Sequence, residues 1–290
     1  MQFAKARRSM LAASLAALFG WAAAAHAQAP AQPSPPPVAA QSTLDAIAAR
    51  GKLIVGCVPD LPYAGEDPRT GRWRGYVPLM AADIAKILKV EWECVPVTWG
   101  TAALALQAGR VDVVLDLGAT PQRALVVDFV GPSNRQAFMM ITRRGLTGST
   151  WEDFNKPEIR VAVQIGTTNE TILNRMAPRA TKVGLPPGTD PSLSVSSGRA
   201  DAFLATFLSG TIAHSKNPGI GDLVLPTPIV SADSSIAMRY EADPRWRSFL
   251  QTWMTYNIKL GNIPEWVKQG LIDSGVSADR LPDLMRRAGY

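Results

Sequence analysis

Two short segments of the chain combine residue types that can hold an anion. They are Thr120-Pro121-Gln122-Arg123 and Gly166-Thr167-Thr168-Asn169-Glu170, and each follows an apolar run. Thr is a frequent helix N-cap, and Pro suits the first helical position. The free backbone N–H groups at a helix start attract anions, and Arg123 can add two hydrogen bonds to a carboxylate. The pattern therefore predicts two carboxylate-binding helix starts.

Both segments also have a purely structural interpretation. Thr120 could be only a cap, and Arg123 could lie on the surface. Thr167 and Glu170 have the spacing of a capping box, in which the Glu side chain bonds back to the cap. Local spacing leaves the two interpretations open.

Strand-like and helix-like segments alternate along most of the chain, which indicates parallel βαβ units and a layered α/β fold. The predicted helices are 43–50, 77–90, 99–110 and 167–177, with a further helix opening at 120. The predicted strands are 53–58, 90–97, 111–117 and 159–166, and residues 190–207 are expected to form a helix and then a strand. A helical tail is predicted from Asp243 to Tyr290, with Trp246, Phe249, Leu250 and Trp253 packing into the core or between helices.

One pattern occurs twice. The segments LQAGRVDVVL (106–115) and VSSGRADAFL (195–204) share a helix end, Gly-Arg-x-Asp and an apolar strand. This weak duplication indicates two related lobes.

The N-terminus has the pattern of a secretory signal peptide over residues 1–27, with cleavage expected after Ala27. Residues 28–42 are Pro-rich without periodicity, and we expect a disordered linker. The signal carries three of the 30 basic residues and none of the 24 acids, so its removal lowers the net charge from +6 to +3. This small charge, with no basic run and interleaved aromatics, gives no support for nucleic-acid binding. We expect an exported, periplasmic protein.

The two cysteines, Cys57 and Cys94, fall in strand-like segments. An oxidising compartment permits a bridge between them. Two separately buried thiols remain the alternative. The two cysteines and two histidines do not have the spacing of a metal site.

Four segments together resemble a known family. They are GKLIVGCVPDLPY, WGTAALALQAGRVDVVLDLGATPQR, VAVQIGTTNET and GRADAFLATF. Their order and spacing resemble the periplasmic solute-binding proteins of ABC transporters, polar amino-acid type (family 3), over roughly Thr43 to Gly270. The resemblance implies two α/β lobes with parallel-rich sheets joined by two crossing strands, near 137–144 and 234–240. The implied first lobe is discontinuous, at 43–142 and 234–290, and the second is 143–233.

The resemblance also implies roles for individual residues. Asp60 matches the first-loop acid, Tyr63 the aromatic that stacks on the ligand, and Trp99 an apolar contact. Arg123 matches the carboxylate-binding arginine, and the carboxylate cradle of the second lobe matches Gly166, Thr167 and Thr168.

The chain departs from the family at the other binding positions. Leu115, Asp116 and Gly118 stand where small polar groups are usual, and Asp116, Leu117 and Gly118 are included among the candidate binding residues. Thr206 stands where the second lobe supplies an acid for the α-ammonium. A hydroxyl cannot replace that carboxylate, because an unpaired buried charge is costly. Either Asp60 or Asp116 takes this role, or the ligand is not an ordinary α-amino acid. Asp116 could instead be satisfied by nearby backbone amides.

The leading hypothesis is a monomeric binding protein without cofactor, metal or catalysis. It would capture a small carboxylate-bearing solute by hinge closure and deliver it to an ABC permease in the inner membrane. One alternative is an enzyme resembling cyclohexadienyl dehydratase, with Glu170 as general acid. Another is an accessory or sensory protein that acts through a protein partner.

Overall fold

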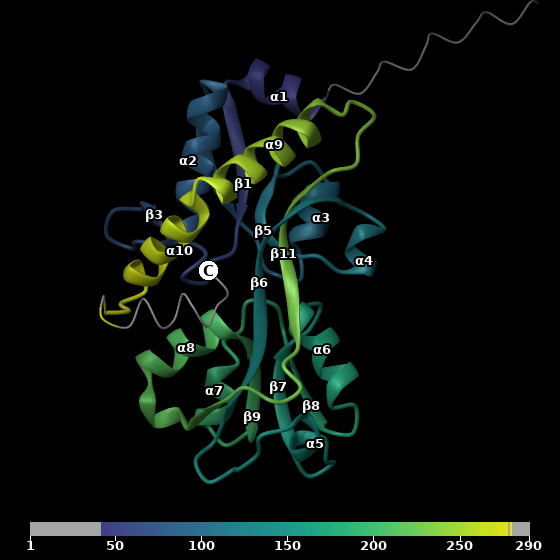
Figure 1. Cartoon of the computed structure of the whole chain (residues 1–290), viewed down its shortest axis with the longest axis vertical. Coiled ribbons are helices and arrows are strands. Elements are labelled where there is room, and N and C mark those ends of the chain that lie inside the picture. Colours follow the sequence, from purple (N-terminus) through teal and green to yellow (C-terminus); the bar gives the residue numbers. More distant parts are fainter. Residues whose placement is uncertain (1–41, 278, 280–290) are drawn as a thin grey trace, which may run out of the picture. The chain divides into compact units, whose positions relative to one another are not determined.

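The computed structural model describes residues 42–277 and 279. The predicted signal peptide, nearly all of the predicted linker and the end of the predicted helical tail lie outside these residues. The described chain forms two lobes linked by long strands (Figure 1). We call the first lobe the elements from α1 to α4 together with α9 and α10, and the second lobe the elements from α5 to β10.

The first lobe begins as the sequence predicts. Helix α1 (Thr43–Arg50) starts at Ser42, whose hydroxyl accepts the N–H of Asp45, and it ends at Gly51, whose positive φ of 68° suits a residue without Cβ. Strand β1 (Lys52–Cys57) pairs in parallel with β4 (Glu91–Pro96). The remaining elements of this part are β2 (Gly65–Glu66), β3 (Trp73–Arg74), α2 (Tyr76–Leu88), α3 (Ala102–Gln107), β5 (Val114–Gly118) and α4 (Pro121–Ala124).

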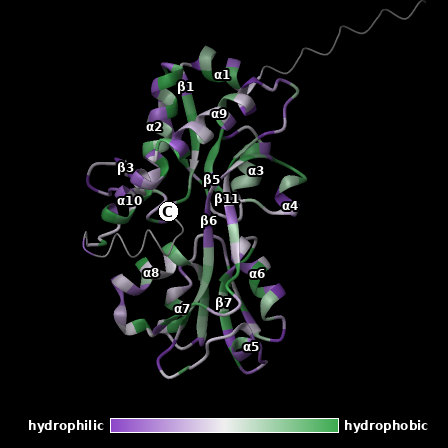
Figure 2. Ribbon diagram, in the orientation of Figure 1, coloured by the Kyte–Doolittle hydropathy of each residue, from purple (hydrophilic) through white to green (hydrophobic). Residues whose placement is uncertain are grey.

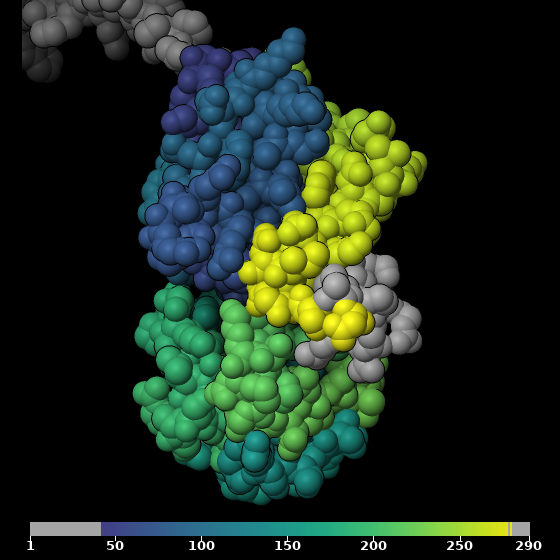
Figure 3. Space-filling model, turned by 90° about the vertical axis from the view of Figure 1, so that its left-hand side faces the viewer, coloured from purple at the N-terminus to yellow at the C-terminus, as the bar shows by residue number. Residues whose placement is uncertain are grey.

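Two C-terminal helices complete the first lobe, α9 (Arg245–Lys259) and α10 (Asn262–Asp273). In Figure 3 they lie in yellow beside the blue first-lobe residues. Trp246 stacks on Phe249 with ring centroids 5.6 Å apart, and Trp253 stacks on Trp266 at 5.8 Å. Both Trp246 and Trp253 are buried. This confirms the prediction that the aromatic residues of the tail form packing contacts.

The second lobe contains a parallel arrangement of β7 (Arg160–Gln164) between β8 (Thr181–Leu185) and β9 (Ala202–Thr206). Strand β8 and helix α8 (Phe207–Lys216) were not predicted. The other elements of this lobe are α5 (Trp151–Phe154), α6 (Thr168–Met176), α7 (Ser192–Ser196), the 3₁₀ turn η1 (Pro218–Ile220) and β10 (Asp222–Val224).

Two long strands connect the lobes, β6 (Asp128–Thr142) and β11 (Ser231–Met238). They pair antiparallel over most of β11. Towards the first lobe, β11 pairs with β5, where Ser234 lies opposite Gly118. Towards the second lobe, β6 pairs with β9, where Phe138 lies opposite Thr206. Because β6 and β11 run between the lobes and belong to neither alone, the residue boundaries of the lobes stay predictions.

Hydrophobic residues are frequent in the strands, β1 and β7 among them (Figure 2). The second lobe has a core cluster around Phe138, Trp151 and Phe154, and the first lobe has one around Leu106, Leu117 and Val127. A larger cluster includes Leu53 and Trp246 from the first lobe and Phe203 from the second. Burial of this apolar surface is the main force that holds each lobe together.

The duplicated Gly-Arg-x-Asp segments have the same structural role in both lobes. The Asp112 carboxylate accepts the N–H of Ile54 at 2.8 Å and pairs with Arg50. The Asp201 carboxylate accepts the N–H of Arg160 at 3.0 Å and pairs with the Arg160 guanidinium. Each Asp therefore anchors the first parallel strand of its lobe.

Cys57 at the end of β1 and Cys94 on β4 form a disulfide, with their Cα atoms 5.5 Å apart. The bridge ties together two neighbouring strands just before the loops that follow them. It closes a chain segment with a sequence separation of 37 residues.

We expect loss of this disulfide to destabilise the protein without changing the fold. Closing a loop of this length restricts the unfolded chain, and the expected effect on the free energy of unfolding is about 2–4 kcal/mol. Urea unfolding with and without reductant measures it. The Cys57→Ala/Cys94→Ala variant should match the reduced protein and be insensitive to reductant, and equal stability of oxidised and reduced wild type would contradict the prediction.

Candidate functional site

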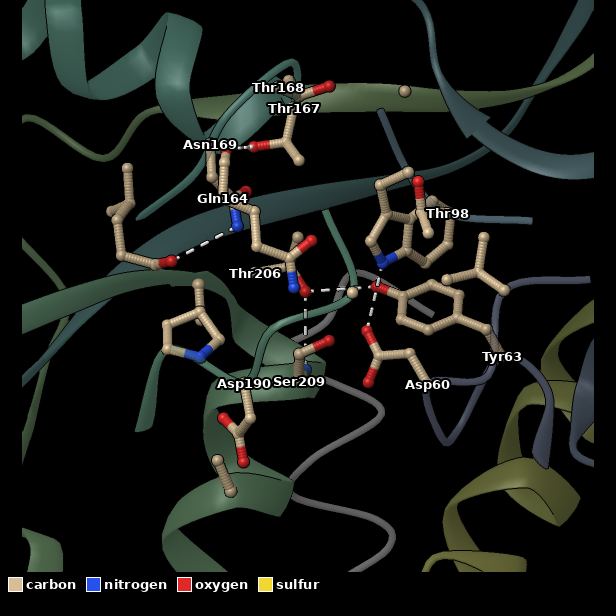
Figure 4. Close-up of a pocket in the computed structure, with 18 of the residues that line it drawn as sticks. Asp60, Tyr63, Thr98, Gln164, Thr167, Thr168, Asn169, Asp190, Thr206 and Ser209 are labelled. Carbon is tan, nitrogen blue, oxygen red and sulfur yellow. Dashed lines mark hydrogen bonds between the residues drawn. The ribbon is translucent and has the colours of Figure 1, made fainter. Parts of the chain in front are cut away.

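A cavity of about 800 Å³ lies between the two lobes. It is lined by the segments that follow the carboxyl ends of β1, β4, β5, β7 and β9, and by the middle of β6. Ligands of parallel α/β sheets bind at such strand ends. Nine of the eleven candidate ligand-binding residues line it, several of them drawn in Figure 4: Asp60, Tyr63, Trp99, Asp116, Gly118, Arg123, Thr167, Thr168 and Thr206.

The other two candidates are not part of the cavity wall. Leu117 is fully buried in the core cluster of the first lobe. Successive strand residues face opposite sides, so Asp116 and Gly118 face the cavity while Leu117 faces away. Including Leu117 was therefore wrong. The side-chain-free Gly166 does not line the cavity, but its carbonyl accepts from Arg123 at 3.3 Å.

Asp60 lies in the loop after β1 and accepts the indole N–H of Trp99 at 3.2 Å. Removal from water disfavours its charged form and raises its pKa to about 6, although the Trp99 hydrogen bond and the field of Lys216 oppose the shift. Lys216, which also lines the cavity, is the cation whose field favours the Asp60 carboxylate.

Tyr63 connects the two lobes and the crossing strand. Its hydroxyl donates to Gln136 Oε1 at 2.9 Å and lies 3.1 Å from Thr206 Oγ1 (Figure 4). Its ring packs edge-on against Trp99, with centroids 4.8 Å apart, and on Tyr76 at 5.4 Å. Burial, followed by the charges of Asp116 and Asp60, raises the pKa of the Tyr63 hydroxyl well above its usual value. Tyr63 is therefore a fixed neutral donor.

Asp116 is buried, and its hydrogen-bond partners are side chains. It accepts from the Tyr76 hydroxyl and from Asn134 Nδ2 at 3.1 Å. Burial nevertheless raises its pKa. The sequence left open that backbone amides donate to this carboxylate. The donors are side chains instead, so this alternative was wrong on this point, although the carboxylate does have hydrogen-bond partners.

Arg123 joins the lobes through backbone carbonyls. Its Nη1 donates to Gly118 O at 2.8 Å, and its Nη2 donates to Trp99 O at 2.5 Å and to Gly166 O at 3.3 Å. Nη1 also lies 3.5 Å from Thr168 Oγ1. Burial lowers the pKa of the guanidinium to about 10. Of the nitrogen atoms of Arg123, only Nε has no hydrogen-bond acceptor among the described residues.

The two predicted helix starts differ in whether they reach the cavity. Helix α4 is a single turn of four residues, and Thr120 caps it by accepting the N–H of Arg123. Of Thr120 and residues 121–124, only Arg123 lines the cavity, so the prediction that this helix start forms an anion site was wrong. Helix α6 has nine residues, and its start lines the cavity. Within the described part of the chain, the N–H groups of Thr168 and Asn169 have no acceptor.

Glu170 is engaged outside the cavity. It accepts the N–H of Gly166 at 2.8 Å and pairs with Lys182 at 2.7 Å, and the Lys182 hydrogen bond lowers its pKa. In a capping box the Glu170 carboxylate would accept the N–H of the cap residue, Thr167. It accepts the N–H of Gly166 instead, the residue before the cap. A lowered pKa and an ion pair oppose a role as general acid.

Sequence reasoning missed several polar residues of the cavity. Gln136 lines the cavity and shares one face of β6 with Asn134, which does not, and a polar side chain every second residue in a buried strand is a signal that could have indicated it. Segments between predicted elements carried no such signal. The cavity residues found only in the structure include Gln136, Gln164, Asn169, Asp190, Ser209 and Lys216.

The described residues contain neither a candidate metal site nor a candidate membrane span. No cluster of His, Cys, Asp or Glu there has the arrangement of a metal site. None of the helices described is both long and apolar enough to span a membrane.

We expect Asp60 to make the stability of the ligand-free protein pH-dependent. Its pKa is raised on folding, so its stabilising effect is present in acid and is lost as pH rises from about 4 to about 6. Asp60→Asn removes this dependence and should stabilise the protein at pH 7.5 by about 1–2 kcal/mol relative to wild type. Thermal unfolding between pH 4 and 8 measures it.

The matched control is Asp222→Asn, an exposed aspartate on β10. The stability of this variant should show the same pH dependence as that of wild type, because Asp60 is unchanged. Parallel curves for wild type and Asp60→Asn would contradict the assignment.

The arrangement of two α/β lobes around a shared cavity is that of a ligand-binding protein. Residues 53–269 match the bacterial extracellular solute-binding proteins, family 3. The chain belongs to this family.

Named relatives agree with this placement. The glutamate/glutamine/aspartate/asparagine-binding protein BztA of Rhodobacter capsulatus is 25% identical over 267 residues, which are 87% of this chain and 76% of that protein. The ancestral amino acid-binding protein AncCDT-1, a precursor of cyclohexadienyl dehydratase, is 29% identical with a TM-score of 0.69. The P235GK mutant of ArgBP from T. maritima is 27% identical with a TM-score of 0.70. Each of these two comparisons covers 79% of this chain and 99% of the other.

Proposed function

We propose that this protein binds a small carboxylate-bearing solute, an amino acid or a related compound, in the cavity between its lobes. It acts in the periplasm and delivers the solute to an ABC importer. Family membership supports the transport role, and the names of BztA, AncCDT-1 and ArgBP support this class of ligand.

The observation that carries the proposal is a set of donors at the wall of the cavity. The N–H groups of Thr168 and Asn169 open helix α6 without an acceptor in the described chain, and Arg123 Nε lies at the same junction of the lobes. A helix start and a guanidinium together favour an anion. A ligand carboxylate would complete these hydrogen bonds.

The same contacts support the proposal of hinge closure. Arg123 and Gly118 belong to the first lobe, whereas Gly166 and Thr168 belong to the second. A Cβ on Gly118 would overlap the Thr168 hydroxyl, so the absence of a side chain permits this close approach. A ligand that bonds to both sides favours the closed arrangement, because it binds that state better than the open one.

A dehydratase function is not supported by the position of Glu170, which is paired with Lys182 outside the cavity. The role of an accessory protein with a protein partner has no observation in its favour. Solute binding is therefore the function that the site supports best.

The test is calorimetric and thermal-shift binding with amino acids, 2-oxo acids, dicarboxylates and aromatic acids. A ligand at a hundred times its dissociation constant should stabilise the protein by about 2.7 kcal/mol. We expect Arg123→Ala to weaken the best ligand at least tenfold but to affect its carboxamide analogue much less.

Arg69→Ala, an exposed arginine in the loop between β2 and β3, is the matched control and should bind like wild type. Equal losses for the acid and its amide would show that Arg123 acts only by joining the lobes. A protein that binds none of these solutes would contradict the proposed function.

A further inference from the structure

Gln136 lies in the middle of the crossing strand β6, between the two lobes. Its side chain is only 3% exposed, and it lines the cavity. It shares one face of β6 with Asn134 and Phe138, because residues two apart point to the same side. Asn134 bonds to Asp116 of the first lobe, and Phe138 belongs to the core of the second. Gln136 thus lies on the strand segment between the two lobes, paired with Ala232 of β11.

A chain of hydrogen bonds fixes which end of the Gln136 amide faces Tyr63. Thr206 Oγ1 accepts the N–H of Ser209 at 3.4 Å and lies 3.1 Å from the Tyr63 hydroxyl. If Thr206 donates to Tyr63, and Tyr63 donates to Gln136 Oε1, every hydroxyl has both a donor and an acceptor partner. The flipped amide would donate to Tyr63 and leave the Thr206 hydroxyl hydrogen without an acceptor. The network therefore favours Oε1 towards Tyr63.

This orientation leaves an unused donor in the site. Gln136 Nε2 is buried and has no hydrogen-bond partner in the described chain. Leaving a buried donor unpaired is unfavourable, so a ligand that supplies an acceptor gains binding energy there. An ammonium group has three donors and no acceptor, and against Nε2 it would leave both groups unpaired.

The neighbouring carboxylates do not change this preference. Asp116 already accepts from the side chains of Tyr76 and Asn134, and Asp60 accepts from Trp99. Thr206 presents a hydroxyl, not a carboxylate, and both of its hydrogen-bonding functions are used by Ser209 and Tyr63. Among the described residues beside Tyr63 and Thr206, the unpaired atom is therefore a donor, Gln136 Nε2, whereas the unpaired acceptor Gln164 Oε1 lies on β7 of the second lobe.

We propose that Gln136 is a specificity-determining residue that selects a carboxylic acid carrying an acceptor oxygen, a 2-oxo or 2-hydroxy group, over the corresponding 2-amino acid. This inference rests on the proposed function and names the class of ligand that the same cavity prefers. Gln136 Nε2 donates to the oxo or hydroxyl oxygen, while Arg123 and the start of α6 hold the carboxylate.

The test compares matched ligands that differ only at carbon 2. The probes are glutamate, 2-oxoglutarate and 2-hydroxyglutarate, and phenylalanine, phenylpyruvate and phenyllactate, each measured by calorimetry with the purified chain. Wild type should bind the oxo or hydroxy member of at least one set at least tenfold more tightly than its amino member.

The variants are Gln136→Glu and Gln136→Met. Glu keeps the oxygen that accepts from Tyr63 and replaces the donor by a second acceptor, so it should reverse the preference at least tenfold towards the amino acid. Met keeps the length of the side chain without a donor, and it should bring the ratio close to one. Gln107→Glu, the same change at an exposed position of α3, is the control and should keep the wild-type ratio.

Each result separates this inference from the proposed function. An amino acid that wild type binds as tightly as its oxo partner would overturn the role of Gln136 and leave solute binding intact. The same holds if amino-acid binding is unchanged in Gln136→Glu and Gln136→Met but is lost in Asp60→Asn, because Asp60 would then hold the ammonium. Failure of all six probes and of the wider solute panel would overturn both proposals.

Discussion

Strand β6 is the element on which the site depends, because it runs from one lobe to the other. Its early residues pair with β11, which in turn pairs with β5 of the first lobe, and its later residues pair with β9 and β10 of the second. This continuous pairing places Asn134, Gln136 and Phe138 on one face between the two lobes. Asn134 and Gln136 pair with Ser234 and Ala232 of β11, so the strand register sets where their polar groups lie. The loops around it supply the other walls of the cavity.

Arg123 shows why a charged residue can have two roles at the junction of two lobes. Its terminal nitrogens bond to carbonyls of Trp99 and Gly118 on one side and of Gly166 on the other. These carbonyls partly compensate the desolvation that lowers its pKa. The arginine therefore stabilises contact between the lobes, and its Nε remains available at the cavity. In the proposed function, closure of the lobes and recognition of a carboxylate would thus be connected through one side chain.

The charges of the cavity are neutralised to different degrees. Asp116 has two side-chain donors, Tyr76 and Asn134, whereas Asp60 has one and lies in the field of Lys216. Burial raises the pKa of both. The hydroxyls of Tyr63 and Thr206 and the amide of Gln136 form a neutral group on the crossing strand and the adjoining strand end. The cavity wall therefore combines charged side chains with a neutral hydrogen-bonded group.

The α/β class, the order of most elements and the strand ends that carry Asp60, Trp99, Asp116 and Thr167 could be predicted from the amino-acid sequence. Local signals sufficed for these, because caps, glycine stops and apolar periodicity act over a few residues. Nine of the candidate binding residues meet at one cavity, since parallel strands place their carboxyl ends at the same edge. The direction of Leu117, the engagement of Arg123 with carbonyls, the side-chain donors to Asp116 and the unpaired amide of Gln136 become visible only in the folded chain. These depend on contacts between residues far apart in the chain, such as Tyr63 with Thr206, and no local pattern specifies which distant group becomes a partner.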